Sequence, residues 1–328
     1  MIAVTGANGL LGSFIIRKLI ENKESFVAIK RTNSDTSLLQ DVAQYITWRD
    51  ADVADEVALA DALEDVTHVI HAAAIVSFNP RKADQLMDIN VMGTRNVVNA
   101  CLVKNVKRLV HISSVAALGR QKEQRVIDEK NKWVDSSINS TYAESKYFAE
   151  LEVFRGQEEG LSTVIINPSV ILAPANWDNS SAKLFKYVWN EKPFYVDGFL
   201  NYVDVRDVAA IAYRMLHEKV EGERFIANAG NIAFKNFFSR LATSFHKKAP
   251  HIKLNSTTLK IIARLENFRS WFTSSEPLIT KETARIAGTE FIYDNKKIRQ
   301  LFSFEFQPID ASIEWCCQYY SEKMAGKK

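Results

Sequence analysis

The chain has few cysteines, no long apolar run and little excess charge, and each shortage excludes a class of protein. Its 328 residues include only Cys101, Cys316 and Cys317. These fit neither a disulfide framework nor a zinc-ligand spacing, so no metal site is expected. A reduced, cytoplasmic setting is expected instead. No run of about 20 apolar residues occurs, so we expect no membrane-spanning helix. A net charge of +3 predicts no nucleic-acid-binding surface.

The apolar start of the chain is not typical of a signal peptide. Residues 1–20 contain many apolar side chains, but no charged segment comes first, and Arg17 and Lys18 interrupt the run. A strand, a turn and a helix explain this stretch better. With 47% hydrophobic and 25% charged residues, the chain has the composition of a globular protein, and its length suffices for one large domain or two.

Residues 5–12 (TGANGLLG) form a glycine-rich turn between a β-branched run and a predicted helix. Gly6 permits a tight turn, Gly9 lets backbone amides approach a pyrophosphate, and Gly12 lets the helix lie close to the sheet. The helix N-terminus offers unpaired N–H groups to the phosphates. A loop without a ligand is the alternative, since the common fingerprint has one residue between its first two glycines. The predicted cofactor contacts in this loop are Gly6, Asn8, Gly9, Leu10 and Leu11.

The second predicted strand, residues 26–29, ends in two cations and no acid. NAD-binding sites place a carboxylate near this point for the ribose 2′-hydroxyl. Lys30 and Arg31 stand there instead, and a guanidinium can bind a 2′-phosphate in a fork and stack on an adenine. Arg31 is therefore a predicted contact for NADP(H), and a solvated strand end is the alternative.

Strand and helix patterns alternate through the first half of the chain. Strands are predicted at 48–53, 67–74 and 108–112, and helices at 55–63, 83–104 and 142–157. This alternation is typical of a doubly wound, mostly parallel sheet.

Two of these strands end in residues that suit a bound dinucleotide. Asp52 and Val53 lie at the exit of the third strand, where an adenine amine could be met. Ala72, Ala73 and Ala74 end the fourth strand, and small side chains at the carboxyl end of a parallel strand leave room for a ligand. A well-packed strand end is the alternative interpretation of the alanines.

Tyr142 and Lys146 are four residues apart on a predicted helix, so they lie on one helical face. A lysine ammonium near a phenol lowers the pKa of the phenol, which makes the tyrosine a general acid at neutral pH. Ser114, at the end of the strand predicted at 108–112, could hydrogen-bond the same substrate oxygen. Two surface side chains at helical spacing are the alternative.

Eight motifs, taken in order, resemble the extended branch of the short-chain dehydrogenase/reductase superfamily over nearly the whole chain. They are Thr5–Gly12, Asp52–Val53, His71–Ala74, Asn90–Thr94, Ser113–Ser114, Tyr142–Lys146, Asn167–Ser169 and Tyr202–Ala209.

The resemblance implies a catalytic set of Ser114, Tyr142 and Lys146. In such enzymes the tyrosine exchanges a proton with the reacting oxygen, and the lysine also binds the nicotinamide ribose. It further implies that Pro168 and Val170 border the nicotinamide through their backbone, and that Asn90 supports the active-site hydrogen bonds.

The resemblance also implies an α/β fold in two parts. A Rossmann domain, which binds NAD(P), would comprise residues 1–167 plus about 200–228. A smaller, mainly C-terminal α/β domain for the substrate would comprise 168–199 and 229–328. A striped amphipathic helix is predicted at 258–272, either as a lid on the substrate domain or as a membrane-surface element.

Two subclasses of the family compete. Nucleotide-sugar epimerases and dehydratases hold NAD tightly and commonly carry an arginine at the position of Leu200. Leu200 and Arg31 together favour an NADP(H)-dependent oxidoreductase that reduces a ketone or aldehyde to an alcohol. A third class, dinucleotide-binding regulators without activity, usually lacks the tyrosine or lysine. The expected partner is a small carbonyl or alcohol substrate, and both a monomer and a homodimer remain open.

Overall fold

A seven-stranded parallel sheet is the largest element of the computed structural model, which describes residues 1–328 except 121–123, 137, 178–180, 256–257, 259–290 and 326–328. The order of its strands is β11-β7-β5-β4-β1-β2-β3, and every neighbouring pair is parallel. The strands are β1 (Ile2–Thr5), β2 (Phe26–Lys30), β3 (Trp48–Asp50), β4 (His68–His71), β5 (Arg108–Ile112), β7 (Thr163–Pro168) and β11 (Glu223–Ala227).

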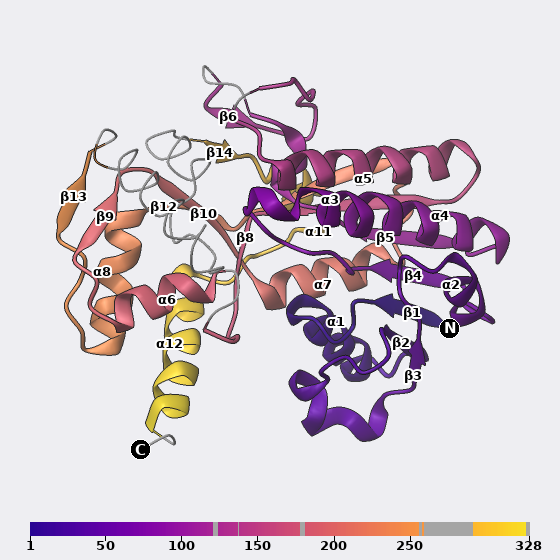
Figure 1. Ribbon diagram of the computed structural model, residues 1–328, viewed down its shortest axis with the longest axis horizontal. Helices are drawn as coiled ribbons and strands as arrows, with labels where there is room; N and C mark the ends of the chain where they lie inside the picture. The colour runs from indigo at the N-terminus through magenta and orange to yellow at the C-terminus, as the bar shows by residue number, and fades with distance from the viewer. Residues whose placement is uncertain (121–123, 137, 178–180, 256–257, 259–290, 326–328) are drawn as a thin grey trace.

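The central strands are apolar on both faces because helices cover both sides of the sheet. Every residue of β1, β5 and β7 is buried, as expected for a parallel sheet between two helical layers. One layer contains α1 (Leu10–Glu21) and α7 (Val205–Met215), and the other contains α2 (Glu56–Ala62), α4 (Gly93–Val103) and α5 (Thr141–Glu158) (Figure 1). The predicted α/β fold with a doubly wound, mostly parallel sheet is thus confirmed.

The single helix predicted at 83–104 is interrupted. The structure has α3 (Ala83–Leu86), a π-helical segment η3 (Met87–Met92) and then α4. Asn90 lies in the π-helical segment, and its side chain bonds both backbone groups of Ile75. A π-helical turn within a longer helix is often found at functional sites, and apolar periodicity alone did not reveal this one.

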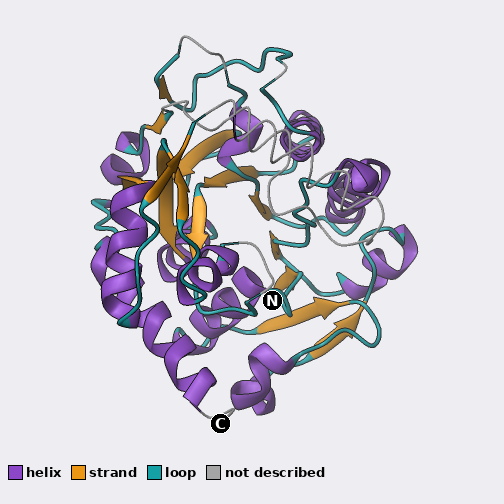
Figure 2. Cartoon of the chain, turned by 60° about the vertical axis from the view of Figure 1, so that its left-hand side comes forward, coloured by secondary structure: helices purple, strands orange, loops and turns teal. Residues whose placement is uncertain are grey.

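A second part of the molecule packs around its own apolar core. Its three-stranded sheet has the order β12-β10-β8, and Figures 1 and 2 show helices α6, α8 and α12 beside it. β10 pairs with β8 and β12, whereas α7, which follows it directly, packs against the large sheet. These elements are β8 (Val170–Leu172), α6 (Ala182–Trp189), β10 (Phe199–Asp204), β12 (Gly230–Ala233), α8 (Phe234–Phe245) and α12 (Ile309–Ala325). The predicted domain boundaries stay a prediction.

Short elements complete the fold. Two small parallel pairs join β6 (Val126–Ile127) to β14 (Ile292–Tyr293) and β9 (Phe194–Val196) to β13 (Ile252–Leu254). The remaining helical pieces within the described residues are η1 (Ser37–Tyr45), η2 (Pro80–Lys82), η4 (Val115–Leu118) and α11 (Lys296–Phe302). Among the helices that the structure describes, none is long and apolar enough to cross a membrane. The amphipathic helix predicted at 258–272 lies outside the described residues, apart from its first position.

Candidate active site

The glycine-rich turn packs backbone against backbone. Gly6 has a φ of +66°, and a Cβ there would lie 2.7 Å from the Cα of Ala73. A Cβ on Gly12 would lie 2.1 Å from the carbonyl oxygen of Gly6. Both glycines are therefore required by close approach, and the turn touches the end of β4 directly. At Gly12, α1 lies close to the turn itself, whereas the sequence predicted that Gly12 lets the helix lie close to the sheet.

The start of α1 presents free backbone donors. Gly9 is the N-cap residue, with φ −76° and ψ 170°, and no side chain caps the helix. The amides of the first helical turn, at Leu10, Leu11 and Gly12, have no partner within an α-helix. Gly9 itself donates to the Gly6 oxygen at 3.0 Å, which closes the turn. This geometry suits an anion such as a pyrophosphate.

A buried hydrogen-bond chain links the turn to β4 and α4. His71 Nδ1 is 2.7 Å from Thr5 Oγ1, and His71 Nε2 is 3.1 Å from Thr94 Oγ1. Thr94 Oγ1 in turn donates to the carbonyl oxygen of Asn90. Burial lowers the pKa of His71 to about 3, so the imidazole is neutral and serves here as a structural bridge. The alanines after His71 run from half-buried, at Ala72 and Ala73, to exposed at Ala74.

The two cations at the end of β2 differ in their surroundings. Lys30 Nζ lies 2.7 Å from Asp50 Oδ1 and 5.9 Å from the ring centre of Trp48. Arg31 is exposed, and no hydrogen bond or ion pair holds its side chain within the part of the chain that the structure describes. The loop after it is tied to the glycine turn, because Asn8 Nδ2 donates to the Asp35 oxygen at 3.1 Å. Arg31 is therefore the cation available to a ligand.

Asp52 and Val53 lie at the end of β3, as predicted, and both have local structural partners. Asp52 Oδ1 accepts from the Ala54 amide at 3.0 Å. Val53 is buried, its oxygen accepts from Asn96 Nδ2 at 3.0 Å, and its Cγ2 leaves no room for a Cβ on Gly93. The second Asp52 oxygen has no recorded partner among the described residues.

The structure brings the three predicted catalytic residues to one place. Ser140 caps α5 by accepting from the Ala143 amide at 3.0 Å, which sets Tyr142 and Lys146 in the first turns of the helix. The Ser114 side chain lies near enough to the Tyr142 phenol to act on its pKa. Lys146 is only 2% exposed, and its Nζ donates to the Ile112 oxygen, at the end of β5, at 2.9 Å.

The acid–base properties differ from the sequence prediction. Burial raises the pKa of Tyr142 above its ordinary value, while the nearby Ser114 side chain acts in the opposite direction. The lowering of this pKa that the sequence predicted is therefore not the net result, because burial outweighs the opposing effect, and the Lys146 ammonium donates to a backbone carbonyl. Burial lowers the pKa of Lys146 itself to about 8, and Glu150 opposes this change.

Asn90 connects the two halves of the site. Its side chain accepts from the Ile75 amide at 2.9 Å and donates to the Ile75 oxygen at 3.0 Å. It also donates to Ser145 Oγ at 3.0 Å, and Ser145 donates to the Tyr142 oxygen at 2.8 Å. The loop after β4 is thus fastened to the start of α5.

Pro168 and Val170, the predicted nicotinamide neighbours, stand where the chain leaves the large sheet. Pro168 is the buried last residue of β7, paired with Ala227 of β11. Val170 opens β8 and is 39% exposed. Asn167 brings β7 next to the catalytic strand end, because its Nδ2 donates to the Ser114 oxygen at 2.9 Å. Among the described residues, no group of His, Cys, Asp and Glu could hold a metal ion.

The sequence analysis missed a buried carboxylate in this site. Glu150 accepts from Ser113 Oγ at 2.5 Å and from Asn167 Nδ2 at 2.5 Å. A signal was present, because Tyr142, Lys146 and Glu150 repeat every four residues and so share one helical face. Its ion-pair partner Arg224 could not be found this way, since 74 residues separate the two.

Comparisons with known proteins agree with this geometry. The model of the NAD dependent epimerase/dehydratase family matches residues 2–230. A Synechocystis protein named "Putative dihydroflavonol 4-reductase" is 28% identical over 305 residues, which cover 90% of this chain and 88% of that protein. Cinnamoyl-CoA reductase 1 of Petunia hybrida is 26% identical over 76% of this chain and 78% of its own length.

Solved structures share the whole fold. The crystal structure of gox2253 superposes with a TM-score of 0.84 at 28% identity, covering 98% of each chain. The Bordetella bronchiseptica enzyme WbmH, solved with NAD+, has a TM-score of 0.77 at 20% identity, again over 98% of each chain. At that identity the second likeness concerns the fold alone.

Proposed function

Because this chain belongs to the NAD dependent epimerase/dehydratase family, we propose that it is an NADP(H)-dependent oxidoreductase that reduces a ketone or aldehyde to an alcohol. Its resemblance to the extended short-chain dehydrogenase/reductases is confirmed by reductase relatives. The observation that carries the proposal is that Tyr142, Ser114 and the buried ammonium of Lys146 meet where β5 ends and α5 begins. These groups can donate a proton to a substrate oxygen and orient it.

The residues of this chain fit a dinucleotide. The free amides at the start of α1 would hold the pyrophosphate, and Gly6 and Gly9 keep side chains out of its way. Arg31, exposed and unpaired among the described residues, would take the 2′-phosphate. The further proposed contacts are Asn8, Leu10, Leu11, Asp52, Val53, Ala72, Ala73, Ala74, Tyr142, Lys146, Pro168 and Val170.

The protein side of the reaction follows from the geometry. A bound nicotinamide would supply the hydride for the carbonyl carbon. The raised pKa of Tyr142 keeps its phenol protonated at neutral pH, so that Tyr142 can donate this proton to the carbonyl oxygen as the alcohol forms. Ser114 holds the same oxygen by a hydrogen bond. The Lys146 ammonium stabilises the negative charge left on the tyrosine oxygen.

Leu200 supports a reductase over a nucleotide-sugar epimerase or dehydratase. Leu200 is 3% exposed and packs in the core of the second part of the molecule. It pairs in register with Ile232, so an apolar contact occupies the position where epimerases commonly carry an arginine for the diphosphate. An epimerase with tightly bound NAD is the second candidate, since the family includes such enzymes.

A cofactor titration tests the proposal first. Purified protein, checked for carried-over dinucleotide, is titrated with NADPH and NADH by fluorescence. We expect clear preference for NADPH. Arg31→Ala should weaken NADPH binding roughly tenfold and leave NADH binding unchanged, because a single charge-assisted contact contributes about 1.5–3 kcal/mol. Lys30→Ala is the matched control, since Lys30 is already paired with Asp50, and it should change neither affinity more than about twofold.

Two results would contradict the reductase proposal. Tightly bound NAD in the purified protein, without any preference for NADPH, would mean that Arg31 is a surface cation and would favour the epimerase. NADPH binding without turnover of any aromatic or aliphatic ketone or aldehyde would favour a dinucleotide-binding regulator.

A further inference from the structure

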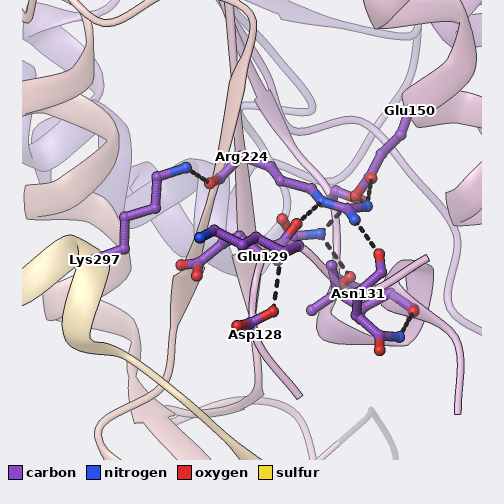
Figure 3. Close-up of polar contacts among 11 residues, drawn as sticks. Asp128, Glu129, Asn131, Glu150, Arg224 and Lys297 are labelled. Carbon is purple, nitrogen blue, oxygen red and sulfur yellow. Dashed lines mark hydrogen bonds and ion pairs between the residues drawn. The ribbon is translucent and has the colours of Figure 1, made fainter.

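Glu150 is an acidic side chain with no solvent contact, placed directly behind the proposed catalytic residues. It is 1% exposed and lies on α5, one helical turn after Lys146. Both of its oxygens are bonded: Oε1 accepts from Ser113 and Asn167, and Oε2 lies 3.2 Å from Arg224 Nη1. A buried carboxylate is unfavourable unless it is fully paired, and this one is (Figure 3).

The hydrogen bonds of Glu150 join the two strand ends that carry the proposed site. Ser113 follows β5 directly and precedes Ser114. Asn167, near the end of β7, bonds Glu150 and the Ser114 carbonyl with the same amide group. These contacts connect the Glu150 carboxylate to the backbone of Ser114 through Ser113 and Asn167.

Arg224 holds Glu150 from the edge of the large sheet. It is on β11, and its guanidinium also donates to the carbonyl oxygens of Glu129 and Asn131 (Figure 3). Its own carbonyl accepts from Lys297 Nζ at 2.7 Å. The guanidinium that pairs with the Glu150 carboxylate is therefore itself held by the segment 129–131.

The charge of Glu150 acts on Lys146. Burial lowers the pKa of Lys146 and the Glu150 carboxylate opposes that change. Burial raises the pKa of Glu150, while Arg224 and the hydrogen bonds from Ser113 and Asn167 oppose it. Among the described residues, the other titratable groups close to Lys146 are Tyr142, one turn earlier on α5, and two histidines, His71 of β4 and His111 of β5. Both histidines are neutral, because burial lowers the pKa of each well below its ordinary range.

We propose that Glu150, held in place by Arg224, is a positioning residue that keeps Lys146 charged and Ser114 aligned with Tyr142. This inference rests on the proposed function. It assigns a role in the reaction to two residues that do not themselves touch the substrate, and it makes the Glu150–Arg224 ion pair part of the active site.

The test compares Glu150→Gln with Glu152→Gln. Both variants remove one carboxylate from α5, but Glu152 pairs with Arg155, away from the site. The titration of the Lys146 ammonium is followed by ¹⁵N NMR in the full chain, with its signal assigned by its loss in Lys146→Met. We expect the midpoint to fall by about one pH unit in Glu150→Gln, because the neighbouring negative charge is lost, and to stay unchanged in Glu152→Gln.

Turnover provides the second readout. The alkaline limb of the pH profile of kcat should move to lower pH by the same amount in Glu150→Gln. At the optimum, kcat should fall about tenfold, while KM for NADPH changes less than about twofold. Since the NMR titration needs no substrate, an absence of turnover in the wild-type protein would contradict the proposed function and leave the test of Glu150 intact.

Arg224→Met keeps the inference testable if Glu150→Gln does not fold. Removing Arg224 raises the pKa of Glu150 further, so the Lys146 midpoint should shift in the same direction by a smaller amount. In the double variant the shifts should be non-additive, because the two residues act as one unit. Reduced stability with an unmoved Lys146 midpoint and an unmoved pH profile would overturn the proposal and leave the ion pair a structural one.

Discussion

The two ends of the proposed site are built by different means. At the glycine turn, backbone lies against backbone, and a Cβ on Gly12 would be 2.1 Å from a carbonyl oxygen. At the catalytic end, buried side chains with opposite charges, Lys146 and Glu150, are held by hydrogen bonds. The first end should therefore respond to added volume and be indifferent to pH. The second should respond to charge and pH.

The largest effect is expected for Gly12→Ala. The added methyl group meets backbone atoms of Gly6 and Ala7, which cannot rotate away, so we expect the free energy of unfolding to fall by about 3 kcal/mol at any pH. Gly9→Ala is the matched control, because its Cβ would be 3.2 Å from the nearest atom. It should weaken dinucleotide binding more than it lowers stability. Urea denaturation at pH 6 and pH 8 checks both variants. A loss of stability in Gly12→Ala that depends strongly on pH would contradict the expectation that the glycine turn is indifferent to pH.

Asn90→Ala tests the connection between the two ends. It removes the side chain that pairs both backbone groups of Ile75 and bonds Ser145. Leaving buried polar groups unpaired should lower the free energy of unfolding by about 2 kcal/mol. The control is Asn99→Ala on α4, whose side chain donates to the exposed Glu56 and accepts from the half-buried Arg155, and its loss should be within about 0.5 kcal/mol. Equal losses in the two variants would contradict a bridging role for Asn90.

A smaller effect is expected at Asp207, a buried carboxylate outside both ends. Burial raises its pKa to about 7, so the folded state binds this proton more tightly than the unfolded state does. Stability should therefore fall as pH rises from about 4 to about 7. Asp207→Asn removes that fall, so the free energy of unfolding should decrease less between pH 4 and pH 8 in this variant than in the wild type.

The Asp207 variant distinguishes the pH dependence of stability from the pH dependence of catalysis, because Asp207 lies outside both ends of the site. The control is Asp310→Asn, at an exposed carboxylate paired with Arg240. Denaturation at both pH values is the measurement. If Asp207→Asn moved the pH profile of kcat, the assignment of that profile to Lys146 and Glu150 would be wrong.

Local patterns predicted what depends on neighbours in sequence. The strand at 108–112 agrees with β5 residue for residue, and the helix predicted at 142–157 agrees with α5 within one residue. Spacing on one helical face also indicated Tyr142 and Lys146 as a pair. The roles given to these residues, and the cofactor contacts, stay predictions.

Features that depend on distant segments could not be predicted in this way. The π-helical segment at Asn90 is stabilised by Ile75, which lies 15 residues earlier in the chain. The pKa of Tyr142 depends on its burial, and Lys146 donates to Ile112, which lies 34 residues away. The pairing of Glu150 with Arg224 requires β7 and β11 to be neighbours, which only the folded sheet establishes.

Single-turnover hydride transfer is the most direct test of the central claim. Protein loaded with NADPH is mixed with an excess of a reducible aromatic ketone, and the loss of nicotinamide absorbance is followed for the wild type and for Tyr142→Phe. The account predicts a rate at least about 100-fold lower in Tyr142→Phe, because the proton donor is lost, with NADPH affinity within about twofold. An unchanged rate in Tyr142→Phe would contradict the assignment of Tyr142 as the proton donor.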